Sequence, residues 1–386
     1  MNAKPFSFVA GVVPVLATAF LFGACSSSKS NAVPDGESAG AAGETAAGGA
    51  DGVAGSGSAG TGLVAGNESC DHLLLRLPHV TTETDVSGLA VAAGEVFVTT
   101  TDAHDRVVSE VSTGTPIEVG RVPSGGAFIL GPSALAADAD AVYLDVVKGD
   151  TGQGRSLQKL PRAGGAPTEL AAFKNSNGFV SPPFVSDANY AYLEQVAAIS
   201  SLSRVALADG TSEIVRKDAF YGGGYVGMGA DDTRVYVAAH NLDAGSYLMR
   251  VIAKTPSEDA ALMNQADYQL GDCTTSPSAL AVDGGKVYVG CANDGSKLRQ
   301  IYALTPGLPE STNPAQLVQS GARIHYEPIA VAAGTLYFAD DSHVYSVPVT
   351  GGTPKVLMAS YGIAYITTDD TSVYVAGACG VQKAAL

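Results

Sequence analysis

Four short polar segments place carboxylates close to histidine or asparagine, the residue types that bind a divalent cation or support acid–base chemistry. These segments are Asp102-Ala103-His104-Asp105, His240-Asn241-Leu242-Asp243, Asn293-Asp294-Gly295 and Asp340-Asp341-Ser342-His343. Within them, His240, His343 and Asp341 are the candidate ligand-binding side chains. Asp, Asn and Gly are also the residues that β-turns require, and no spacing here matches a known cation-binding loop. We therefore expect no catalytic residue, metal or cofactor, with a structural or catalytic divalent cation as the alternative.

Aromatic side chains occur in the segments that connect the expected repeats to one another. They are Phe128, Phe179, Tyr221, Tyr225, Tyr326 and Tyr361. Gathered on one face, they would line a shallow pocket for a glycan or a peptide. The alternative is that they cover the apolar core between repeats, and the sequence leaves both interpretations open.

Four cysteines in addition to Cys25 indicate a pair of disulfides in an oxidising compartment. Cys273 precedes the strand around Leu280 and Cys291 follows the strand around Tyr288, so a hairpin would bring the two together. This favours Cys273–Cys291, and Cys70–Cys379 then follows by elimination, although four cysteines allow three connectivities. No Cys-x-x-Cys or Cys–His pattern is present, so both disulfides are expected to be structural.

The elements that must position these residues follow from an internal repeat. An apolar residue, most often Val, precedes an aromatic residue at seven regularly spaced positions: Val96-Phe97, Val142-Tyr143, Ala191-Tyr192, Val235-Tyr236, Val287-Tyr288, Leu336-Tyr337 and Val373-Tyr374. The spacings between the aromatic residues run from 37 to 52 residues, which is typical of β-propeller blades. Around each aromatic residue the pattern predicts four short strands separated by polar or Gly-containing turns.

The last repeat has three strands between Ala364 and Leu386, one fewer than a blade needs. The apolar segment Leu73–Leu77 precedes the first complete repeat and has no other partner, so we expect it to supply the missing outer strand. The prediction is an all-β chain whose residues 70–386 form a β-propeller of seven four-stranded blades, closed by an N-terminal strand. Six blades is the alternative.

With Val-Tyr in the second strand, these repeats resemble the bacterial β-propeller lipoproteins, related in pattern to the TolB-like, YWTD and NHL propellers. The resemblance covers about residues 72–386 and implies the architecture. Such propellers bind proteins, sense ligands or carry hydrolase and lyase sites. We expect a protein- or ligand-binding module rather than an enzyme, and the alternative is a metal-dependent propeller enzyme resembling lactonases or lyases.

The N-terminal residues indicate the cellular compartment of the protein. Residues 1–24 form a short apolar signal-peptide pattern, and Leu21-Phe22-Gly23-Ala24-Cys25 resembles the bacterial lipobox. The resemblance implies an acylated Cys25 and a lipid anchor in the bilayer, while ordinary cleavage with a free Cys25 is the alternative. Residues 25–69, rich in Ser, Gly and Ala, are expected to be a flexible linker.

Charge limits the class of partner. The formal net charge is −16, and removal of the signal peptide with Lys4 makes it −17. An acidic chain disfavours nucleic acid and anionic lipid as partners. By resemblance to well-studied lipoproteins, Ser26 and Ser27 after Cys25 imply delivery to the outer membrane. We therefore expect a lipid-anchored protein of the bacterial envelope, at the outer membrane, with an envelope protein, a peptide or a glycan as its partner.

Overall fold

The structure is a computed structural model of the 386-residue chain. It divides into two units, Met1–Val64 and Ala65–Leu386, and every residue described below belongs to the second. The described residues are 70, 72–75, 86–102, 105–123, 135–148, 154–174, 184–195, 200–220, 225–241, 246–255, 267–270, 273, 279–293, 298–307, 315–320, 328–340 and 342–386. Over these ranges, no helix has both the length and the apolar character needed to cross a membrane.

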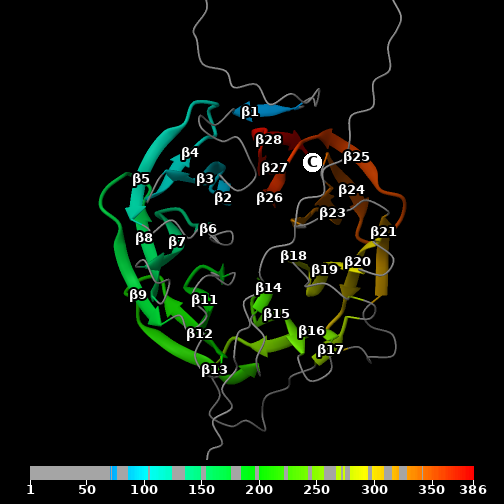
Figure 1. Ribbon diagram of the computed structural model, residues 1–386, viewed down its shortest axis with the longest axis horizontal. Helices are drawn as coiled ribbons and strands as arrows, with labels where there is room; N and C mark the ends of the chain where they lie inside the picture. Colours follow the sequence, from blue (N-terminus) through cyan, green and yellow to red (C-terminus); the bar gives the residue numbers. More distant parts are fainter. Residues whose placement is uncertain are drawn as a thin grey trace, which may run out of the picture. The chain divides into compact units, whose positions relative to one another are not determined.

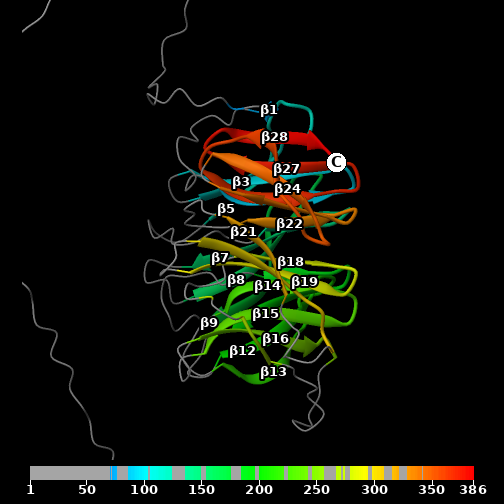
Figure 2. The same ribbon diagram turned by 90° about the vertical axis from the view of Figure 1, so that its right-hand side faces the viewer.

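Seven antiparallel sheets of four strands form a ring, which confirms the seven-bladed propeller and excludes the six-bladed alternative. Figure 1 shows the blades following one another in chain order, from cyan through green and yellow to red. Figure 2 shows the ring edge-on, with the strands running through its thickness. The four strands of each blade are lettered a to d from the centre of the ring outward.

The strands of each blade are as follows. Blade 1 has β2 (Val86–Ala92), β3 (Glu95–Asp102), β4 (Asp105–Glu110) and β5 (Ile117–Pro123). Blade 2 has β6 (Leu135–Ala137), β7 (Ala141–Lys148), β8 (Gly154–Pro161) and β9 (Thr168–Lys174). Blade 3 has β10 (Phe184–Ser186), β11 (Tyr190–Gln195), β12 (Ser200–Ala206) and β13 (Ser212–Phe220). Blade 4 has β14 (Tyr225–Ala230), β15 (Arg234–Asn241), β16 (Ser246–Ala253) and β17 (Asp267–Gln269).

The remaining blades follow the same order. Blade 5 has β18 (Ala279–Asp283), β19 (Lys286–Asn293), β20 (Leu298–Leu304) and β21 (Ala315–Ser320). Blade 6 has β22 (Ile329–Ala332), β23 (Thr335–Ala339), β24 (His343–Pro348) and β25 (Lys355–Ala359). Blade 7 has β26 (Ile363–Thr368), β27 (Ser372–Gly377) and β28 (Gly380–Ala385), with β1 (Leu73–Leu75) as its outer strand.

The predicted closure is therefore confirmed: β1 pairs antiparallel with β28, placing Leu73 opposite Gln382. The amide of Lys383 donates to the carbonyl of His72 at 3.0 Å and extends this pairing. A disulfide joins Cys70 to Cys379 across 309 residues of sequence. The N-terminal strand is thus held to the last blade by both hydrogen bonds and a covalent bond.

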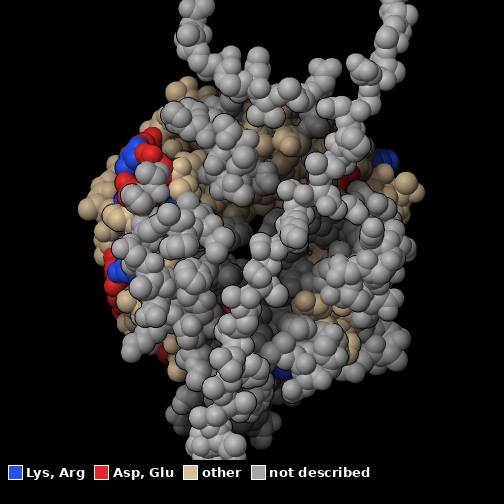
Figure 3. Space-filling model, viewed as in Figure 1, with Lys and Arg blue, Asp and Glu red and all other residues tan. Residues whose placement is uncertain are grey.

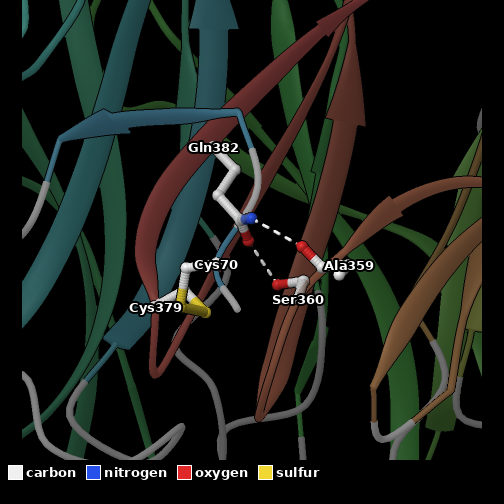
Figure 4. Close-up of a disulfide and its surroundings, with 5 residues drawn as sticks. All are labelled: Cys70, Ala359, Ser360, Cys379 and Gln382. Atoms are coloured by element: carbon white, nitrogen blue, oxygen red, sulfur yellow. Dashed lines mark hydrogen bonds between the residues drawn. A yellow bond between two sulfur atoms is a disulfide. The ribbon is translucent and has the colours of Figure 1, made fainter. Parts of the chain in front are cut away.

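Gln382 connects β28 to blade 6, as Figure 4 shows beside the disulfide. Its side chain is fully buried; the amide donates to the carbonyl of Ala359 at 2.9 Å and its oxygen accepts from the hydroxyl of Ser360. The second disulfide, Cys273–Cys291, links residues 18 apart. Both cysteine pairs favoured by the sequence lie at disulfide distance.

The core consists of seven apolar clusters, one between each pair of neighbouring blades. Between blades 1 and 2, for example, Phe97 and Val108 pack on Val142, Leu144 and Val146. The repeated aromatic residue of every second strand is at most 5% exposed. This burial explains the repeat in the sequence, because each blade needs one large side chain at the same position to fill the widening gap to its neighbour.

Most of these aromatic residues are tyrosines, and a buried phenol needs a hydrogen-bond partner. In blades 2, 3, 4 and 7 the partner is an aspartate five residues earlier, in the turn between strands a and b. Asp138 accepts from the hydroxyl of Tyr143 at 2.7 Å and from the amides of Asp140 and Ala141 at 2.8 Å. One carboxylate thus forms the turn and satisfies the buried phenol.

Blade 1 has neither group: Ala92 stands where the aspartate would be, and Phe97 has no hydroxyl. Its turn instead relies on positive φ at Ala93 and Gly94, 51° and 80°, as a two-residue hairpin turn requires. Two turn chemistries therefore produce the same blade.

Candidate functional site

We define the loop end of the ring as the side that carries the b–c turns and the connections from one blade to the next. Most of the residues predicted to bind a ligand on this side, Phe128, Phe179, Tyr221, Tyr326 and Asp341, lie outside the described residues. Tyr225 and His240 are described in their backbone, and His343 and Tyr361 are described fully.

At the loop end of blade 4, the structure brings Tyr225 and His240 to adjacent positions of one hairpin. Tyr225 pairs with Ala239, and His240 pairs with Tyr247 on its other side. We expected Tyr225 in a connection between repeats and His240 in a polar segment, but both lie in paired strands, because the hairpin pairing of β15 continues to Asn241. Both are strand residues with a fixed backbone.

At the loop end of blade 6, the structure brings His343 and Tyr361 together. The amide of Ser360 donates to the carbonyl of Ser342 at 2.9 Å, which joins the segment before Tyr361 to the turn before His343. His343 Nδ1 lies 2.8 Å from the hydroxyl of Ser342. Tyr361 is 44% exposed, so this pair of candidates is both positioned and accessible.

Asp340, beside them, has a structural role. Its carboxylate accepts from the amides of Ser342 and His343 and, at 2.6 Å, from the hydroxyl of Tyr345. Burial would raise the pKa of Asp340, but these hydrogen bonds outweigh it and hold the pKa below its usual value. Within the described ranges, no three His, Cys, Asp or Glu side chains are grouped so that they could hold a metal ion.

A layer of buried polar residues near the loop end of blades 1 to 3 was not anticipated from the sequence. It lies two residues after the repeated aromatic residue, where these blades carry Thr99, Asp145 and Glu194, each at most 1% exposed. The other four blades have only small residues there: Ala238, Gly290, Ala339 and Ala376. Aligning the repeats on the aromatic residue reveals this contrast in the sequence itself.

In blade 2, the buried acid is paired with an arginine. Arg155, 1% exposed, donates through Nε and Nη2 to the two carboxylate oxygens of Asp145, with an Nε–Oδ1 distance of 3.3 Å. Its Nη1 donates at 2.8 Å to the carbonyl of Glu194 in blade 3. This charge pair also ties two blades together.

In blade 1, the equivalent arginine forms no ion pair with an acid in the part of the chain that the structure describes. Arg106 is 6% exposed and donates from Nη1 to the hydroxyl of Thr101 at 2.5 Å. Burial lowers the pKa of this guanidinium, and the nearby Tyr365 counteracts the shift.

Ion pairs on the rim of the ring form a third polar feature. Arg121 donates to Glu118 at 2.9 Å and to Asp102 at 2.6 Å, and Lys148 pairs with Glu169. Figure 3 shows blue and red atoms gathered along the rim, where Figure 1 places β5 and β9. These exposed pairs contribute little to stability.

Comparison with known proteins identifies propellers at low sequence identity. BamB from Moraxella catarrhalis is 13% identical, with a TM-score of 0.48 over 77% of this chain and 84% of its own. Sqt1 from Saccharomyces cerevisiae is 11% identical, with a TM-score of 0.49 over 82% and 98%. Hsv2 from Kluyveromyces lactis is 8% identical, with a TM-score of 0.47 over 76% and 90%. No family model and no curated protein sequence matches the chain.

Proposed function

We propose that the chain is a lipid-anchored protein of the bacterial envelope whose propeller binds a protein partner at its loop end. The anchor is proposed from the lipobox-like residues that end at Cys25. The observation that carries the binding role is the arrangement at blade 6, where the Ser360–Ser342 backbone hydrogen bond holds the segments of an exposed Tyr361 and a partly exposed His343 at the same end of the blade. Aromatic side chains on a rigid scaffold are typical of protein interfaces, because they bury a large area at a small entropic cost.

The scaffold behind this face supports the proposal. Gln382 and Ser360 are both buried and hydrogen-bonded, and Ser360 directly precedes Tyr361. The binding surface is therefore built on the closure of the ring. Preorganisation of this kind reduces the cost of ordering a loop when a partner binds.

The test compares four versions of the full chain, each crosslinked in native envelopes and purified together with the proteins bound to it. They are the wild type, Cys25→Ala, the double variant His343→Ala/Tyr361→Ala, and Ile117→Ser. Ile117, 56% exposed at the start of β5, lies at the opposite end of its blade and serves as the matched control for loss of an exposed apolar side chain.

We expect one protein to be recovered with the wild type and with Ile117→Ser, and to be lost from the double variant. Cys25→Ala should leave the membrane fraction while keeping the melting temperature of the wild type, because the anchor precedes the propeller. Continued membrane association of Cys25→Ala would contradict the anchor. Equal recovery of the partner with the double variant would contradict the binding face.

A further inference from the structure

Arg106 carries a buried positive charge that no carboxylate of the described residues neutralises. Among the described residues its only hydrogen-bond partner is the Thr101 hydroxyl, and no carboxylate forms an ion pair with it. An isolated charge in a protein interior costs several kcal/mol relative to water unless an opposite charge compensates it. The surroundings of Arg106 therefore favour an anion.

Blade 2 shows which anion the same geometry accepts. Val108, two residues after Arg106, pairs with Thr99, and Leu157, two residues after Arg155, pairs with Asp145. Thr99 therefore stands in blade 1 where Asp145 stands in blade 2. The position that a carboxylate fills beside Arg155 has, in blade 1, the shorter and uncharged threonine side chain.

Two buried hydroxyl groups, one on each side of blade 1, have no hydrogen-bond partner within the described residues. The Thr99 hydroxyl is buried and, within the described chain, has no hydrogen-bond partner, and the same is true of the Tyr365 hydroxyl. Burial raises the pKa of Tyr365, although the charge of Arg106 opposes the shift, so this phenol keeps its proton at neutral pH. Tyr365 packs between blades 7 and 1, whereas Thr99 shares a face with Phe97 and Val108, so only the Thr99 hydroxyl is placed to donate to an anion beside Arg106.

The site is close to the surface. Arg106 pairs with Thr101, and the next pair, Asp102 and Asp105, closes the turn at the loop end. Thr101 and Asp105 are both partly exposed. A small ligand thus has one layer of residues to pass.

We propose that blade 1 binds a small carboxylate ligand at Arg106, with the hydroxyl of Thr99 as an additional donor. The ligand carboxylate takes the role that Asp145 has beside Arg155. A two-oxygen anion suits the fork of a guanidinium, because two parallel hydrogen bonds form at once. This site is separate from the proposed protein-binding face at blade 6.

The test uses acetate as the probe and the purified full chain at constant ionic strength. Calorimetric titration should give saturable binding, and acetate should raise the melting temperature. Arg106→Gln should weaken binding by at least about tenfold, since it removes charge-assisted hydrogen bonds. Arg121→Gln, an exposed arginine of the same blade, is the matched control and should bind as the wild type does.

A second variant keeps the proposal testable should Arg106→Gln fail to fold. Thr99→Asp supplies the carboxylate within the chain, as in blade 2, so it should melt above the wild type without acetate and lose the response to acetate. The proposal is overturned by an absence of acetate binding, by equal stabilisation from chloride, or by a Thr99→Asp variant that still binds acetate.

Discussion

Arg106 and Arg155 have equivalent places in neighbouring blades but different surroundings. Arg155 donates to both oxygens of Asp145 and to a carbonyl of blade 3. Breaking such a pair from one side leaves a charge in the interior, which costs more than the pair itself contributes. The loss of Asp145 alone should therefore destabilise the interface between blades 2 and 3, although apolar packing also holds it.

Asp145→Asn tests the importance of this pair. The amide keeps the shape of the side chain but leaves Arg155 without its counter-charge, so the free energy of unfolding should fall by about 3–5 kcal/mol. Urea unfolding measures the loss. Glu169→Gln breaks the exposed pair with Lys148 in the same blade and should leave the unfolding midpoint nearly unchanged, and equal midpoints for the two variants would contradict the structural role of Asp145.

At the scale of the strand pair, the a–b turn couples acid titration to the core. Burial would raise the pKa of Asp138, Asp231 and Asp369, but the hydrogen bonds from the tyrosine and the turn amides lower it overall. The folded chain thus holds fewer protons than the unfolded chain just below the usual aspartate pKa of about 3.9. These turns stabilise the fold above that pH, and the contribution is lost as the pH falls towards the lowered pKa values.

The tyrosines act at the other end of the pH scale. Burial and the bond to Asp231 raise the pKa of Tyr236 to about 12. The folded chain therefore keeps a proton that the unfolded chain releases near pH 10. The stability from this pair is complete below about pH 10 and is lost as the pH rises through the raised pKa.

The triple variant Asp138→Asn/Asp231→Asn/Asp369→Asn should show a shallower loss of melting temperature between pH 5 and pH 2 than the wild type. The amides still accept from the turn but no longer titrate. Asp140→Asn/Asp232→Asn/Asp370→Asn changes three exposed acids of the same turns and is the matched control. If the control variant reduced the loss of melting temperature at acid pH as much as the first variant, general charge repulsion rather than the Asp–Tyr pairs would explain that loss.

These elements also show what sequence reasoning could reach. The seven aromatic residues predicted the blade count because each fills the same buried position, and Leu73 predicted the closure because an apolar strand needs a partner. The Asp–Tyr pairs were missed although their spacing of five is visible, since a turn aspartate looks the same with or without a phenol to bind. The carboxylate site was missed because Thr99 matters only beside Arg106 and by contrast with Asp145.

The ligand face is less predictable for a physical reason. Blade strands are fixed by pairing and burial, whereas loops in general are constrained less by either. His240 and Tyr225 were identified as candidates in a polar segment and in a connection between repeats, but both lie in strands, because the end of a hairpin depends on pairing that continues beyond the apolar residues. His343 and Tyr361 come together through a backbone hydrogen bond that no residue type announces.

At the scale of the whole molecule, the ring depends on β1. This strand contributes pairing to β28, and Cys70–Cys379 restrains the two ends of the domain in the unfolded chain as well. A cross-link over so long a loop removes much of the unfolded state's entropy. Closure is therefore both a packing effect and a chain-entropy effect.

A chain that begins at Asn67 should melt well above one that begins after Leu77, since the second lacks both β1 and Cys70. Cys70→Ser in the longer chain separates the two effects, and losing the disulfide alone should cost about 2–5 kcal/mol. Thermal melts under oxidising and reducing conditions measure both. Identical melting temperatures for the two chain lengths would show that blade 7 is stable with three strands.

Cys70 precedes β1, and its sulfur is bonded directly to the turn between β27 and β28. A pull on the chain from its N-terminal side would therefore reach the last blade through a covalent bond before it loaded the three-residue strand behind it. The hydrogen bonds between β1 and β28 are thereby bypassed, and they would carry the load only after the disulfide had been reduced. The oxidation state of Cys70–Cys379 therefore decides whether such a pull acts first on β1 or on the turn between β27 and β28.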